Sequence, residues 1–203
     1  SAVKNASAPA LLAVVLAGAA CSTLAAQDVI SAQAGLVSYA EGPVLLNERE
    51  ALPARGLFPQ MKEQETLRTT GSRAELLLSP GVFLRLGPES AIRLVSGKIT
   101  HPRVELLAGT VVLEAARISK DTAVIVTVRN ASVSILKRGF YRIGAAPAEL
   151  KVFDGKARVV ADDQAIELGR GRSLTLAANS VVAKFDRKRL DPQVRTRLDV
   201  RPA

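Results

Sequence analysis

The stretch Arg73–Ser90 constrains the fold of this chain more than any other feature, because apolar residues alternate with polar ones on both sides of a short turn. Alternation at every second residue is typical of a β-strand. Ser79-Pro80-Gly81 predicts a three-residue loop in which the glycine takes the left-handed conformation that such loops need. The stretch therefore predicts a β-hairpin.

The facing residues of this hairpin follow from its turn. If Leu78 lies opposite Val82, then Glu75 lies opposite Arg85 and the two form a cross-strand ion pair. The outer face also carries apolar residues, which indicates a strand pair stacked between other layers. These apolar residues are Leu77 and Phe83.

Short strand patterns separated by Gly, Pro, Asn or Asp continue along most of the chain, and no sustained helical period interrupts them. We expect strands at residues 35–39, 44–47, 66–70, 74–78, 82–86, 91–95, 104–107, 110–114, 123–128, 132–136, 140–143, 150–153, 157–160, 165–168 and 173–176. This series predicts an all-β domain over residues 35–178. The expected architecture is two packed, antiparallel-rich β layers, or a short β-roll with a solenoid-like stack.

Two parts of the domain resemble each other in sequence. Placing Leu78 over Leu136 brings Gly81 over Gly139 and Phe83 over Tyr141. Self-similarity over a long period indicates a repeated supersecondary unit, here residues 65–116 and 123–178.

The N-terminal segment reads as a targeting signal. Lys4 precedes an apolar run over residues 8–20, and small residues follow up to Ala26. We expect residues 1–26 to be a signal helix that is removed near Ala26, which would leave an exported chain without cysteine. Two alternatives stay open: an uncleaved membrane anchor, and a lipoprotein modified at Cys21.

The C-terminal residues 184–203 form a basic tail in a chain of net charge +9. A short helix is expected from Asp191 to Val200, with Pro192 at its first position. Outside the cytoplasm such a tail suits an acidic protein, anionic lipid or lipopolysaccharide, and nucleic acid is not expected as a partner. The candidate partner-binding residues are Lys184, Arg187, Lys188, Arg189, Arg195 and Arg197.

The residues that could carry catalysis are few. His101 is the one histidine of the sequence, and it lies in a Thr-His-Pro turn with no second imidazole to share a metal. Adjacent acidic residues in a loop cannot act as a facing acid and base. We therefore expect no enzyme, no catalytic residue, no metal site and no cofactor.

Several stretches together resemble the FecR domain. The early part of the resemblance is carried by Thr66-Leu67-Arg68-Thr69, by Gly71-Ser72-Arg73-Ala74-Glu75-Leu76, and by Leu84-Arg85-Leu86-Gly87-Pro88-Glu89-Ser90. The later part is carried by Gly139-Phe140-Tyr141-Arg142-Ile143 and by Leu150-Lys151-Val152-Phe153-Asp154-Gly155. The resemblance implies a non-enzymatic β-domain outside the cytoplasm. In signalling members of that family this domain receives an outer-membrane iron-siderophore transporter, and a cytoplasmic segment controls a sigma factor.

These observations favour an exported, stand-alone FecR-like module that binds a protein partner in the cell envelope. Because a targeting segment directly precedes the domain, we expect no cytoplasmic segment to contact a sigma factor. One alternative is an envelope-surface protein that binds polyanions through its tail. Another is a signalling component of iron-siderophore regulation that acts with separate membrane proteins.

Overall fold

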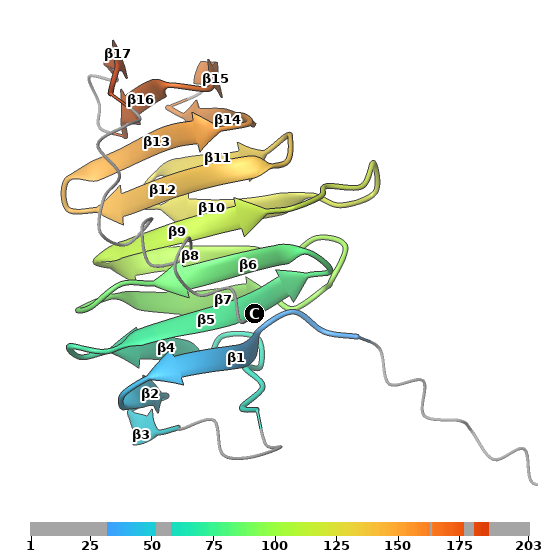
Figure 1. Ribbon diagram of the computed structural model, residues 1–203, viewed down its shortest axis with the longest axis vertical. Coiled ribbons are helices and arrows are strands. Elements are labelled where there is room, and N and C mark those ends of the chain that lie inside the picture. Colours follow the sequence, from blue (N-terminus) through green and yellow to red (C-terminus); the bar gives the residue numbers. More distant parts are fainter. Residues whose placement is uncertain (1–31, 52–57, 163, 177–180, 187–203) are drawn as a thin grey trace, which may run out of the picture. The chain divides into compact units, whose positions relative to one another are not determined.

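The computed structural model describes residues 32–51, 58–162, 164–176 and 181–186, which form strands and turns with no helix among them. They belong to the compact unit Ala32–Ala203, and the other unit is Ser1–Ser31. The all-β prediction is confirmed (Figure 1). The strands are β1 (Leu36–Glu41), β2 (Val44–Leu46), β3 (Arg49–Glu50), β4 (Thr66–Thr69), β5 (Arg73–Ser79), β6 (Val82–Leu86), β7 (Ala91–Ser96), β8 (Arg103–Ala108), β9 (Thr110–Ala115), β10 (Val124–Val128), β11 (Ala131–Ile135), β12 (Gly139–Ala145), β13 (Ala148–Asp154), β14 (Lys156–Ala161), β15 (Gln164–Gly169), β16 (Arg172–Thr175) and β17 (Val182–Lys184).

These strands form two sheets that enclose one core. The eight-stranded sheet has the order β1-β5-β6-β9-β12-β13-β16-β17, and the nine-stranded sheet has the order β15-β14-β11-β10-β8-β7-β4-β2-β3. Neighbouring strands of the described chain are antiparallel, except that β8 and β10 run parallel. The prediction of two antiparallel-rich layers is confirmed.

The chain builds both sheets together by crossing between them after one or more strands. After β5 and β6 it crosses to place β7 and β8 in the nine-stranded sheet, returns for β9, and crosses again for β10 and β11. The parallel pair of β8 and β10 results from this path, because β9 lies in the other sheet. Figure 1 shows that both sheets extend in the direction in which the sequence runs, as in a solenoid-like stack.

Along most strands every second residue faces inward, and these inward residues form the core. In β10 and β11 the buried positions alternate with half-buried ones, and in β6 the same pattern places Val82, Leu84 and Leu86 inside. Inward residues of both sheets belong to one continuous hydrophobic cluster. Burial of this apolar surface is the main force that holds the two layers together.

The hairpin of β5 and β6 confirms most of its predicted register and corrects its turn. Glu75 pairs with Arg85 as expected, but Ser79 rather than Leu78 lies opposite Val82, and the register shifts between Leu77 and Ser79. The loop is therefore the two residues Pro80-Gly81, with Gly81 at φ +80°. The bulge lets both Leu78 and Ser79 turn inward and become buried.

Tyr141 of β12 is fully buried, and it contacts the connection between β11 and β12, where the chain crosses from one sheet to the other. Its hydroxyl donates to the Lys137 carbonyl at 2.5 Å and accepts from the backbone N–H of Lys156 at 2.9 Å. Burial raises the pKa of Tyr141 to about 12, so the hydroxyl stays a donor at any physiological pH. At Gly155 a Cβ atom would collide with this hydroxyl, which explains the glycine there.

Other predictions fall outside the described residues or stay untested. The signal helix of residues 1–26 and the helix Asp191–Val200 lie in segments that the structure does not describe. Among the described residues, none forms a helix with the length and apolar character to span a membrane. The internal repeat stays a prediction, and Phe83 and Tyr141, which it superposes, point to opposite sides of their sheet.

We predict that Tyr141→Phe destabilises the domain by about 1–3 kcal/mol, because the Lys137 carbonyl and the Lys156 N–H lose a buried partner. The measurement is the free energy of unfolding from urea denaturation. Tyr39→Phe is the matched control, because Tyr39 is 56% exposed and should change stability by less than about 0.5 kcal/mol. Equal effects of the two substitutions would show that the hydrogen bonds of Tyr141 do not stabilise the fold.

Candidate interaction surfaces

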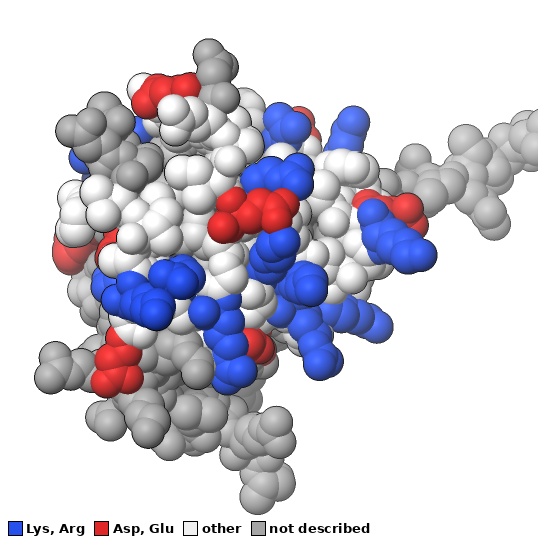
Figure 2. Space-filling model, turned by 90° about the horizontal axis from the view of Figure 1, so that it is seen from above, with Lys and Arg blue, Asp and Glu red and all other residues white. Residues whose placement is uncertain are grey.

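Of the predicted partner-binding residues, Lys184 is the one within the described chain. It lies in β17, is exposed, and pairs with Arg172 of β16, so two cationic side chains come from neighbouring strands. Figure 2, which views the molecule from above the β15–β17 end, shows Lys and Arg prominent over this end, with acidic residues among them. The remaining predicted residues, Arg187, Lys188, Arg189, Arg195 and Arg197, lie outside the described residues.

Part of this positive charge is paired with carboxylates. Glu167 of β15 receives hydrogen bonds from Lys156 and Arg158 of β14, with the Arg158 Nη2 to Glu167 Oε1 distance at 2.7 Å. These hydrogen bonds lower the pKa of Glu167 from 4.5 to about 2. Arg170 lies 3.5 Å from Asp154. Lys156 and Arg158 are therefore engaged with Glu167. Among the described residues of β14 to β17, Arg172 and Lys184 are the cations for which no ion pair with a described carboxylate is found.

The sheet edges differ in how far their backbone groups are engaged. At the β1 edge, Val37 donates to the Pro59 carbonyl at 2.8 Å and Leu36 bridges to Gln60, so the segment around Pro59 covers the start of the strand. At the opposite end, β15 pairs with β14 over its whole length, and no described residue pairs with its other side. A six-residue edge of this kind can accept an added strand.

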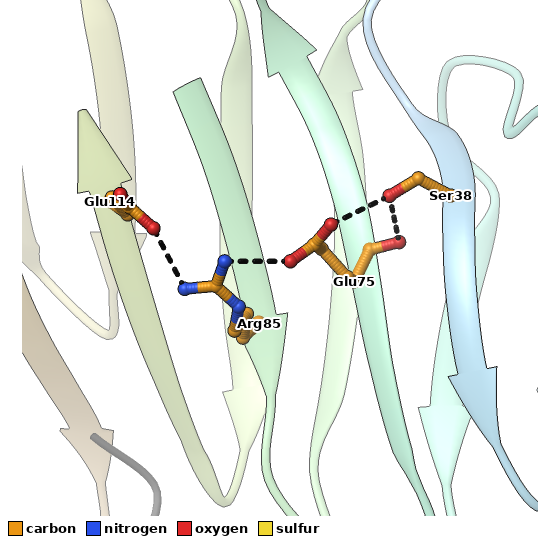
Figure 3. Close-up of polar contacts among 4 residues, drawn as sticks. All are labelled: Ser38, Glu75, Arg85 and Glu114. Atoms are coloured by element: carbon orange, nitrogen blue, oxygen red, sulfur yellow. Dashed lines mark hydrogen bonds and ion pairs between the residues drawn. The ribbon is translucent and has the colours of Figure 1, made fainter. Parts of the chain in front are cut away.

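The outer face of the eight-stranded sheet carries a charged network that crosses four strands (Figure 3). Arg85 of β6 binds Glu75 of β5 at 2.8 Å and Glu114 of β9 at 3.0 Å. Ser38 of β1 donates to Glu75 at 3.1 Å. The Glu75–Arg85 pair confirms the sequence prediction, whereas the contributions of Ser38 and Glu114 were missed because they come from strands that are distant in sequence.

A small apolar cluster lies beside this network on the same outer face. It joins Val112 of β9, Phe140 of β12 and Phe153 of β13 to Phe185, which follows β17. The Phe153 and Phe185 rings meet edge to face, with their centroids 4.9 Å apart. The sequence contained a signal for this cluster, because β9 reads Val111-Val112-Leu113 and β13 reads Val152-Phe153, where strict alternation would place a polar residue.

His101 lies in an exposed turn, where its Nδ1 atom is 2.9 Å from the Thr100 hydroxyl. Within the described ranges, no three His, Cys, Asp or Glu side chains are grouped so as to hold a metal ion. The described surfaces include a strand edge with no described partner, a group of cations, and a sheet face that combines ion pairs with aromatic rings.

We predict that Arg85→Ala destabilises the domain by about 2 kcal/mol, because Glu114 is 5% exposed and loses the guanidinium that binds it. Arg93→Ala is the matched control: Arg93 binds Glu105 on the outer face of the other sheet, but its side chain is 40% exposed. Removing such a solvated pair should cost less than about 1 kcal/mol. Urea denaturation measures both, and a cost for Arg93→Ala as large as for Arg85→Ala would contradict the special role of the Arg85 network.

Comparison with known proteins agrees with this architecture. Two crystal structures, each of a proposed anti-sigma factor from Parabacteroides distasonis, share the fold with a TM-score of 0.51 and identities of 16% and 15%. The match covers 61% of this chain and 61% of each of those chains, and at such identity the likeness concerns the fold alone. No curated protein sequence matches the chain significantly.

The family comparison bears on the sequence itself. The family model described as FecR protein matches residues 65–158, which run from the residue before β4 into β14. This span includes the β5–β6 hairpin, the Arg85–Glu114 pair and Tyr141. It includes all the stretches quoted above for the sequence resemblance. The resemblance to the FecR domain is therefore confirmed over residues 65–158.

Proposed function

We propose that this chain is a non-enzymatic regulatory module that binds a protein partner in the cell envelope. The match to the FecR family supports a sensor or regulatory role, and the structurally similar proteins from Parabacteroides distasonis are described as proposed anti-sigma factors. Location outside the cytoplasm rests on the predicted signal of residues 1–26. Action alongside separate membrane proteins of an iron-siderophore pathway is a narrower form of the same proposal.

The edge of β15 with which no described residue pairs is the observation that carries the binding mode. Gln164, Ala165 and Glu167 are exposed, while Leu168 is buried and fixes the strand against the core. A partner strand could form backbone hydrogen bonds along this edge and read the outer side chains for specificity.

We predict that a photo-crosslinking amino acid at Ala165 captures a discrete envelope protein, because an added strand would lie directly beside this position. The matched control places the same amino acid at Ser132, which lies in the same row of the nine-stranded sheet but on β11, between two strands. The measurement is the adduct mass after irradiation of cells that express the full chain.

Binding by strand addition also predicts which amide hydrogens of the chain become protected in the complex. Amide hydrogens of β15 should become protected from exchange when the captured protein is added to the purified chain, while those of β11 should not change. An adduct from Ser132 alone, or none from either position at low and at physiological salt, would rule out the edge as the binding site.

A second candidate function is polyanion binding at the envelope surface, favoured by the pairing of Arg172 with Lys184 on neighbouring strands and by the basic residues that follow. Each cation close to an anionic membrane contributes about 1 kcal/mol to binding. Salt would screen this attraction, since the Debye length at physiological ionic strength is only about 8 Å.

We predict that changing Arg187, Lys188, Arg189, Arg195 and Arg197 to glutamine weakens binding to phosphatidylglycerol vesicles by at least about a hundredfold at low salt. Vesicle sedimentation measures the affinity. The matched control removes the same charge elsewhere, by glutamine at the exposed residues Lys62, Lys98, Arg103, Lys120 and Arg129. If both variants lose affinity equally, net charge rather than the tail determines binding.

A further inference from the structure

The two sheets end unevenly at the β15–β17 end of the domain. β15 is the last strand of the nine-stranded sheet, and it lies across the core chiefly from β13 and β16. The eight-stranded sheet continues beyond β16 with β17, which lies at the top of the molecule in Figure 1. A strand added at the edge of β15 would therefore lie across from β17 and extend both layers to the same length.

The strand register shows which side chains of β16 and β17 face this position. Residues that lie directly opposite each other on paired strands project from the same face of the sheet. Val152 of β13 is fully buried in the core and pairs with Arg172, which in turn pairs with Lys184. Leu174 is also fully buried, and it pairs with Val182. Arg172, Lys184 and Val182 therefore project from the core-facing side of the eight-stranded sheet.

These three side chains are exposed although they lie on the core-facing side. Val182 is 46% exposed, and Arg172 and Lys184 are exposed as well. Among the described residues, neither cation forms an ion pair with a carboxylate. The core-facing side therefore ends in an apolar side chain beside two cations, and its complement is an apolar side chain beside a carboxylate.

The level of these groups along the strands follows from the turn between β15 and β16. Ile166 and Leu168 project toward the core, because they pair with buried residues of β14. The turn of residues 170–171 joins the two strands, so Leu168 and Arg172 lie near the same end of the sandwich. Ile166 lies two residues further from that end, at the level of Val182.

We propose that the partner strand added to β15 carries a carboxylate and an apolar side chain two residues apart on its inward side. The carboxylate lies beside Leu168, where it pairs with Arg172 and Lys184. The apolar side chain lies beside Ile166, where it covers Val182. This partner chemistry rests on the strand addition proposed above, and it suits either strand direction because one outward residue separates the two positions.

The test measures the affinity of two eight-residue synthetic peptides for the full chain by fluorescence anisotropy. In the first peptide, three valines and one glutamate occupy every second position, and threonine fills the positions between them. In the second, the glutamate exchanges places with a neighbouring threonine, so composition and charge stay the same but the carboxylate lies on the other side of the strand from the valines. We expect the first peptide to bind about tenfold more tightly, because its carboxylate reaches Arg172 and Lys184 while its valines face Val182.

Removal of the two cations should abolish this difference in affinity. In Arg172→Gln with Lys184→Gln, we expect the two peptides to bind equally. The matched control, Lys98→Gln with Arg103→Gln, removes one lysine and one arginine from exposed positions before and in β8 and should leave the difference unchanged. In Arg172→Glu with Lys184→Glu, a third peptide with lysine in place of the inward glutamate should bind more tightly than the first peptide.

Hydrogen exchange of the β15 amides separates the partner chemistry from strand addition itself. Equal affinities of the first two peptides, together with equal protection of β15, would leave strand addition standing and overturn the assigned chemistry. A preference for the inward glutamate that persists in Arg172→Gln with Lys184→Gln would overturn it as well. Failure of every peptide to bind and to protect β15 would also overturn it, and capture at Ala165 would then decide separately whether the edge binds a partner.

Discussion

The alternation of inward and outward residues along most strands is the constraint on which the rest of this structure depends. Each sheet has one face to bury, and the chain meets this requirement by crossing between the sheets so that both supply one core. A slip of one residue in β5 or β6 would bring Glu75 or Arg85 into that core. Because the requirement concerns alternation rather than identity of residues, proteins that share only 16% and 15% identity with this chain can share its fold.

Much of the fold could be predicted from the sequence, because strands and turns are specified by residues that are close together in the chain. The alternation in β5 and β6 and the turn residues between them were sufficient to place Glu75 opposite Arg85. The predicted loop was one residue too long. The sequence Ser79-Pro80-Gly81 is compatible with either a two-residue or a three-residue loop. The choice depends on whether Ser79 is buried, and the opposite sheet determines that.

The candidate surfaces were harder to predict because they depend on strand order. Glu114 lies far from Arg85 in the sequence, and the two meet because β6 and β9 are neighbours once β7 and β8 have crossed to the other sheet. The same crossing brings Phe153 and Val112 together with Phe185. Sequence patterns show that β9 is apolar on both sides, but they do not show what its second apolar side contacts.

The FecR match ends within β14, so β15, β16, β17 and the residues after them lie beyond the matched span. The edge formed by β15, the Arg172–Lys184 pair and Phe185 all lie in this last part. The Arg85–Glu114 pair and the buried Tyr141 therefore lie within the matched span, whereas the strand edge and the cations proposed for binding lie after it. Substitutions that alter binding through β15 or Lys184 can therefore leave the core of the matched span intact.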